Sequence, residues 1–128
     1  MAIYIYRIVA DEKRTVLIVL FIPSVERDGV TPIEQEHWVT AALETFGALF
    51  GGATAFPKGR GVWRDSANEG KLVFDEPVVC HCYTSRDQVE DDAKLDMLHE
   101  FCRRMGKGAN QGEIGLVIDG EYLGITDY

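Results

Sequence analysis

The stretch TVLIVLFI, residues Thr15–Ile22, decides how the chain folds. Both of its alternating sets of side chains are apolar, so a strand formed here is buried on both faces. Such a strand belongs in the centre of a sheet with a covering layer on each side, and Pro23 ends it. The apolar run Ile3–Val9 precedes it across the polar turn at 11–14 and predicts an N-terminal partner strand.

Two amphipathic helices are expected to cover one face of this sheet. Thr31 can cap the free donors of the first helix, with Glu34 completing a capping box, and the glycine pair at 51–52 ends it. Ser85 opens the second helix and Gly106 stops it. The apolar stripes are Trp38, Val39, Ala42, Leu43, Phe46, Leu49 and Phe50 in the first helix, and Leu95, Met97, Leu98, Phe101, Cys102 and Met105 in the second.

Two hairpins complete the pattern. In the first, Pro57 and the pair Gly59/Gly61 interrupt the leading strand, which suits an edge position. In the second, Asp119-Gly120 forms the turn, because both turn residues need positive φ. The strands of the two hairpins are Ala53–Arg64, Lys71–Thr84, Glu113–Ile118 and Glu121–Ile125.

The order of these elements defines the expected fold. From Thr15 to Ile118 it is the split βαβ order of a ferredoxin-like sheet. We therefore expect one α+β domain over residues 1–128, with a mostly antiparallel sheet, two helices on one face and extra strands from N- and C-terminal hairpins. Since the helices cover only one face, the other should be buried by a second subunit, a partner protein or a terminal hairpin. A homodimer or an obligate complex through the sheet is the prediction.

Composition limits the partners and the compartment. The 128 residues suit one domain with a single core. The formal net charge of −8 argues against nucleic acid as a partner, because that binding relies on Lys and Arg neutralising phosphates. The longest apolar run is too short to cross a bilayer, so no membrane partner is expected. Three cysteines cannot all pair within one chain, which favours the reducing cytoplasm.

Cys80-His81-Cys82 resembles a metal site at first sight. On a strand, however, the two cysteines point to one face and His81 to the other, so the three cannot converge on one ion. We therefore interpret these cysteines as structural. His37 falls on the polar face of its helix and is interpreted as a solvent-facing residue. No catalytic residue, metal or cofactor is predicted.

Lys58, Arg60, Trp63 and Arg64 are the candidate ligand- or partner-binding residues. They lie among glycines that would let a ligand approach the backbone closely. Strand alternation would put the three basic side chains on one face and Trp63 on the other, forming a positive stripe for an acidic partner or a small anionic ligand. The alternative, which the sequence favours, is an edge strand protected by charge against aggregation, with Trp63 structural or interfacial.

The middle of the chain also carries a family resemblance. The motif F-G-G-x-T at residues 50–54, followed by G-x-W at 61–63, resembles small uncharacterised bacterial α+β proteins. In these proteins a helix ends in F-G-G/D-x-T and a tryptophan-bearing hairpin follows. The resemblance covers about the middle half of the chain and implies the ferredoxin-like fold. It brings no catalytic residues.

These observations favour a small binding or accessory protein without enzymatic activity, acting through self-association or a protein partner. The alternative is a small-molecule enzyme or ligand-binding protein of the dimeric α+β barrel type, with its pocket between sheet and helices. A cavity of at least ~300 Å³ with convergent polar groups would favour the alternative. A filled core would favour the interaction protein.

Overall fold

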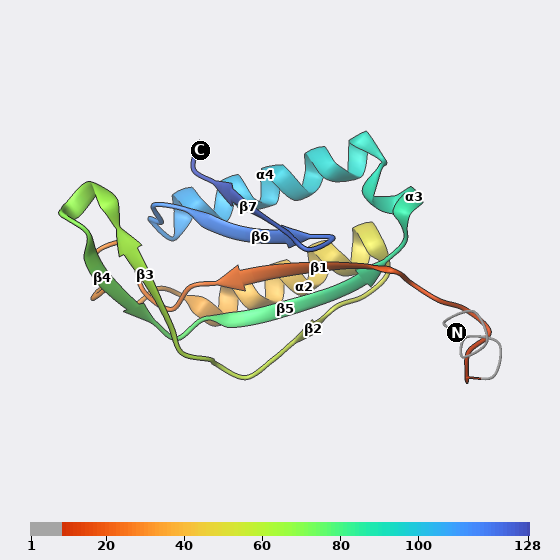
Figure 1. Ribbon diagram of the computed structural model, residues 1–128, viewed down its shortest axis with the longest axis horizontal. Coiled ribbons are helices and arrows are strands. Elements are labelled where there is room, and N and C mark those ends of the chain that lie inside the picture. The colour runs from red at the N-terminus through yellow and green to blue at the C-terminus, as the bar shows by residue number, and fades with distance from the viewer. Residues whose placement is uncertain (1–8) are drawn as a thin grey trace.

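The computed structural model describes residues 9–128, and its main sheet has five strands in the order β2-β5-β1-β6-β7 (Figure 1). Every neighbouring pair in this sheet is antiparallel. The strand predicted at Ile3–Val9 lies outside the described residues except for Val9 itself. The strands of the main sheet are β1 (Val16–Ile22), β2 (Thr54–Ala55), β5 (Val78–Thr84), β6 (Ile114–Ile118) and β7 (Glu121–Ile125).

Helices α2 (Gln35–Phe50) and α4 (Asp92–Gly108) pack on the same face of the sheet (Figure 1), and the short α3 (Arg86–Val89) leads into α4. The units β1-α2-β2 and β5-α4-β6 give the split βαβ order, and β7 extends the edge beyond β6. This confirms the expected ferredoxin-like α+β fold with its helices on one face. Among residues 9–128, no helix is long and apolar enough to cross a membrane.

The core lies between the sheet and the two helices. One set of alternating β1 side chains is fully buried there, whereas the other set is only half-buried on the far face. The central position predicted for this strand is therefore confirmed, since β1 pairs with β5 on one side and β6 on the other. The largest fully buried core side chains include Phe46, Phe101, Ile18, Leu20, Ile22, Leu98, Met105 and Ile114.

The predicted helix starts are wrong by several residues. Thr31 does not cap α2, because its hydroxyl donates instead to the Asp28 carboxylate and its backbone N–H does the same. Helix α4 is capped by Asp91, which accepts a hydrogen bond from the Lys94 backbone N–H, while Ser85 precedes only the short α3. At the other end of α2, the prediction is confirmed: Gly51 ends the helix in the left-handed conformation, with φ at 96°.

Gly106 does not stop the second helix, which continues to Gly108. The ring of Tyr128 packs against Gly106, so closely that a Cβ atom there would lie 2.1 Å from the ring. This glycine therefore makes room for a tertiary contact within the helix instead of ending it.

The predicted strands 53–64 and 71–84 are each divided. The first yields β2 and β3 (Gly61–Asp65), with the break at Pro57 and the glycines, as expected. The second yields β4 (Lys71–Asp75) and β5, because Pro77 has no N–H to continue the ladder. Strands β3 and β4 pair as a separate two-stranded hairpin, which projects from one end of the main sheet (Figure 1). The C-terminal hairpin is confirmed, with positive φ at Asp119 and Gly120.

Candidate functional site

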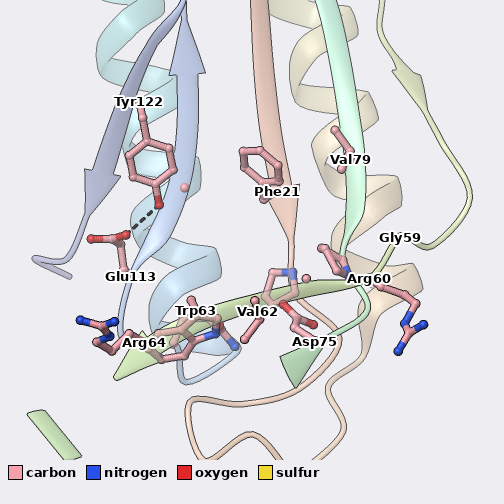
Figure 2. Close-up of a pocket in the computed structure, with 15 residues that line it drawn as sticks. Phe21, Gly59, Arg60, Val62, Trp63, Arg64, Asp75, Val79, Glu113 and Tyr122 are labelled. Atoms are coloured by element: carbon pink, nitrogen blue, oxygen red, sulfur yellow. Dashed lines mark hydrogen bonds between the residues drawn. The ribbon is translucent and has the colours of Figure 1, made fainter. Parts of the chain in front are cut away.

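A groove of about 460 Å³ lies on the open face of the sheet, opposite the helices (Figure 2). Strand β3 crosses below the ends of the sheet strands and closes one side of it. The expected position for a pocket, between sheet and helices, is wrong because the core side chains occupy that space. The groove is lined by Phe21, Pro23, Gly59, Arg60, Gly61, Val62, Trp63, Arg64, Asp75, Pro77, Val79, Gln111, Glu113, Gly115 and Tyr122.

Two apolar walls face this groove. One is formed by Phe21 and Val79, which are directly paired across β1 and β5 and therefore point to the same face. The other is formed by Trp63 of β3, which is 37% exposed; Val62 also lines the groove, although strand alternation turns its side chain to the opposite face of β3. An accessible indole opposite a half-buried phenyl ring provides flat apolar surface that a planar ligand can contact.

The polar end of the groove holds a hydrogen-bonded pair. The hydroxyl of Tyr122 donates to Oε2 of Glu113 at 2.7 Å (Figure 2). Partial burial and the neighbouring Glu113 carboxylate raise the pKa of Tyr122 to about 12, so this hydroxyl keeps its proton at neutral pH. The pair therefore presents acceptor oxygens to the groove, since the proton of Tyr122 is already committed to Glu113.

Two paired glycines leave the space that the side chains of Tyr122 and Glu113 occupy on the sheet. Gly115 and Gly124 lie directly opposite each other on β6 and β7. A Cβ atom at Gly115 would lie 2.8 Å from the Tyr122 hydroxyl oxygen, and one at Gly124 would lie 2.5 Å from Oε1 of Glu113. Real Cβ atoms do not approach so closely, so both side chains lie flat across the sheet only because these positions are glycine.

A cluster of hydrogen bonds holds the base of the β3–β4 hairpin. Both the hydroxyl and the backbone N–H of Ser24 donate to Oδ1 of Asp75, at 2.5 and 2.9 Å. The Ser24 hydroxyl also accepts a bond from the Glu76 backbone N–H at 2.9 Å. Because Asp75 lines the groove and ends β4, these bonds fix the hairpin relative to the open face.

The structure gathers three of the four predicted site residues around the groove. Arg60, Trp63 and Arg64 line it, whereas Lys58 does not. The predicted common strand face is wrong, because β3 begins only at Gly61 and leaves Lys58 and Arg60 in the preceding loop. Figure 2 shows the side chains of Arg60 and Arg64 at opposite ends of the β3 stretch, pointing away from each other.

The cysteines occupy the core face, as their spacing indicates. Cys80, Cys82 and Cys102 are free and buried, and burial raises the pKa of Cys80 and Cys82 to about 11 and that of Cys102 to about 12. Such thiols stay protonated and are poor nucleophiles. His81 lies on the open face, with its ring 4.8 Å from that of Phe56. Within residues 9–128, no group of three His, Cys, Asp or Glu side chains could hold a metal ion.

Sequence reasoning missed the Tyr122–Glu113 pair. The predicted turn at 119–120 fixes the register of the last two strands, and that register puts Glu113 and Gly115 on the same face as Tyr122 and Gly124. The repeated pattern of a polar residue two positions from a glycine, E-x-G and Y-x-G, was therefore the available signal.

Comparison with known proteins finds similarity of structure alone. No protein-family model matches the chain, and no curated protein matches its sequence. A phage SAM lyase in complex with S-methyl-5′-thioadenosine superposes with a TM-score of 0.65 at 14% identity, covering 91% of this chain and 95% of the lyase. The phage SAM lyase in its apo state gives 0.59 at 13% identity, covering 88% and 90%. A divalent ion tolerance protein, CutA1 from Ehrlichia chaffeensis, gives 0.43 at 9% identity, covering 91% and 87%.

Proposed function

We propose that this chain binds a small nucleoside in the open-face groove, and that the ligand belongs to the 5′-thioadenosine class. The observation that carries the proposal is the groove itself, about 460 Å³ in volume with aromatic walls and a polar end. Small-molecule sites typically have volumes of roughly 300–1,000 Å³ and combine apolar walls with a few placed polar groups.

The lining chemistry suits a nucleoside better than an isolated anion. Phe21 and Trp63 offer flat apolar surface for a base, and Tyr122 with Glu113 offers acceptors for hydroxyl groups. Arg60 and Arg64 lie at opposite ends of the β3 stretch (Figure 2), so they do not form a joint site for one phosphate. A neutral or cationic ligand also agrees with the net charge of −8.

The fold neighbour supplies the choice among nucleosides. It is a SAM lyase that holds S-methyl-5′-thioadenosine, and it shares its architecture with nearly the whole of this chain. In the enzymatic form of the proposal, the bond between sulfur and Cγ of SAM breaks as the carboxylate of SAM attacks Cγ, which gives S-methyl-5′-thioadenosine and homoserine lactone. Binding without turnover is the simpler form.

Calorimetry with S-methyl-5′-thioadenosine tests binding, and incubation with SAM followed by chromatography tests turnover. We expect saturable binding that Trp63→Ala weakens by about tenfold, because loss of an aromatic stacking partner costs about 1–3 kcal/mol. Met97→Ala is the matched control, since Met97 is exposed on α4, contrary to its expected place in the apolar stripe, and does not line the groove. Absence of wild-type binding to this nucleoside would contradict the proposal.

Self-association is a second candidate function, favoured by the β3–β4 hairpin. Val62 pairs with Phe74 and Arg64 with Leu72, so three large apolar side chains share one face of this hairpin. Leu72 is 54% exposed and Phe74 is 66% exposed. An isolated two-stranded hairpin is marginally stable in water, and a second copy or a protein partner would cover this face. The binding or accessory role expected from the sequence would act through it.

Light scattering of the wild type and of the double variant Leu72→Ser with Phe74→Ser tests this candidate. We expect an oligomer for the wild type and a monomer for the variant, with the main sheet unchanged. A wild type that stays monomeric at micromolar concentration would remove self-association and leave the groove as the proposed site of function.

A further inference from the structure

The geometry points to a ribose-recognition site: we propose that Glu113, held by Tyr122, accepts hydrogen bonds from the 2′- and 3′-hydroxyl groups of the ligand. This inference rests on the proposed nucleoside function and deepens it. It predicts that the groove selects ribonucleosides over deoxyribonucleosides, with the selectivity built into the C-terminal hairpin.

Glu113 and Tyr122 keep free acceptor positions despite their mutual hydrogen bond. Oε2 of Glu113 accepts the Tyr122 proton at 2.7 Å, and Oε1 receives no hydrogen bond from the described residues. The Tyr122 oxygen can itself accept one more bond. A carboxylate has about four acceptor positions, so both oxygens of Glu113 keep room for a donor, and a ligand carrying neighbouring hydroxyl groups would satisfy both.

The side chains of Glu113 and Tyr122 are also held against the sheet. Gly115 leaves space beneath the Tyr122 hydroxyl and Gly124 leaves space beneath Oε1 of Glu113, so each side chain lies against the sheet surface. The two glycines form a directly paired position of the β6–β7 ladder. A carboxylate held by a rigid support loses less conformational entropy when it binds a ligand.

Contacts between a carboxylate and ribose hydroxyl groups are common in proteins. A carboxylate that accepts from ribose hydroxyls is a recurring device in nucleotide-binding folds, and hydrogen bonds to charged acceptors are stronger than neutral ones. The base would then lie toward Phe21 and Trp63, which line the groove from β1 and β3. The ribose end and the base end of the ligand would be read by different elements of the fold.

The test measures affinities of the full chain for S-methyl-5′-thioadenosine and for its 2′-deoxy and 3′-deoxy analogues. We expect each deoxy analogue to bind about tenfold more weakly to the wild type, as expected for a lost hydrogen bond to a charged group. Glu113→Ala loses both hydrogen bonds, so it should bind the parent nucleoside about a hundredfold more weakly and should no longer distinguish the three ligands. Glu113 and its partner Tyr122 are both exposed, so we expect Glu113→Ala to fold, and thermal melting checks this.

Glu121→Ala is the matched control. Glu121→Ala removes the same charge from the same hairpin. Glu121 pairs with Ile118, however, so it lies on the opposite face of the sheet and does not line the groove. This variant should keep the wild-type affinity and the wild-type discrimination. An equal loss in both variants would show a general charge effect and overturn the assignment of Glu113 to the ribose.

The outcomes separate the two proposals. No binding of the parent nucleoside by the wild type would contradict the proposed function itself. Binding without discrimination, or discrimination that survives Glu113→Ala, would overturn the ribose assignment and leave nucleoside binding in place. The last ligand is S-adenosylhomocysteine, which has an ammonium group that S-methyl-5′-thioadenosine lacks. If Glu113→Ala weakens the binding of this ligand alone, then Glu113 recognises the ammonium group and the ribose assignment is wrong.

Discussion

The two faces of the main sheet are made by the same strands and have opposite characters. On β1, the side chains of Val16, Ile18, Leu20 and Ile22 are fully buried beneath the helices, while Leu17, Val19 and Phe21 are half-buried on the other side. The helix face is closed and filled. The open face is hollowed where β3 crosses it. Apolar residues on both sides of a strand therefore show that both faces are shielded from water. They do not show that the same chain shields both faces.

The largest expected difference between the faces is in the stability lost when a phenylalanine on each face is replaced by alanine. Phe101→Ala removes a ring that is 1% exposed and packed at the helix face, and we expect a loss of about 3–5 kcal/mol in the free energy of unfolding. Phe21→Ala removes a half-buried ring from the groove wall and should cost about 1–2 kcal/mol. Urea denaturation measures both. Equal losses would contradict the difference between a filled and an open face.

Ser24→Ala tests whether the groove depends on the base of the hairpin. The change removes the hydroxyl that donates to Asp75 and accepts from the Glu76 backbone. We expect a loss of about 1–2 kcal/mol in stability and faster amide exchange in β4, since bonds to charged groups contribute more than neutral ones. Ser66→Ala, at the exposed tip of the same hairpin, is the control. Exchange rates in β4 that match those of the control would show that these bonds do not hold the hairpin.

Gly115→Ala should affect the site more than the fold. The added methyl group would lie 2.8 Å from the Tyr122 hydroxyl oxygen, so the ring must move off the sheet and away from Glu113. We expect affinity for S-methyl-5′-thioadenosine to fall by about tenfold, equivalent to one lost charged hydrogen bond. Gly52→Ala is the control, because nothing lies within 4 Å of a Cβ atom there. Unchanged affinity in Gly115→Ala would show that ligand binding does not depend on the space beneath Tyr122.

The smallest expected effect is the late titration of Tyr122. The pKa of Tyr122 is raised from 10.0 to about 12, so its stabilising contribution is present below pH 10 and is lost as pH rises from about 10 to 12. Burial also raises the pKa of Tyr128, so tyrosinate absorbance should show one more late-titrating group in the wild type than in Tyr122→Phe. A wild-type titration without this late step would contradict the Tyr122–Glu113 interaction.

The sequence predicted the fold well because the fold depends on local patterns. The continuous apolar run at residues 16–22, the two helical stripes and the turn at Asp119-Gly120 each identify one element, and their order identifies the ferredoxin-like core. The helix starts failed because Thr31 has a competing partner in Asp28, three residues earlier. Both residues favour local hydrogen bonds, and the capping pattern alone does not decide between them.

The candidate site was predicted only in part because it is assembled from distant segments. The stretch at 57–64 was singled out by its composition, and Arg60, Trp63 and Arg64 do line the groove. Their expected stripe failed because Pro57 and the glycines delay the strand to Gly61. Glu113 and Tyr122 were missed because their significance depends on two glycines that leave space beneath them, and that space appears only in three dimensions.

The two tryptophans provide one direct test of where the ligand binds. Trp63 lines the groove on the open face, whereas Trp38 packs at the helix face with its ring 6.3 Å from that of Phe101. We would record the two indole N–H signals of ¹⁵N-labelled protein during titration with S-methyl-5′-thioadenosine, assigning them with Trp63→Phe. We expect the Trp63 signal to shift in a saturable way while the Trp38 signal stays in place. A shift confined to Trp38, or no shift in either signal, would contradict nucleoside binding on the open face.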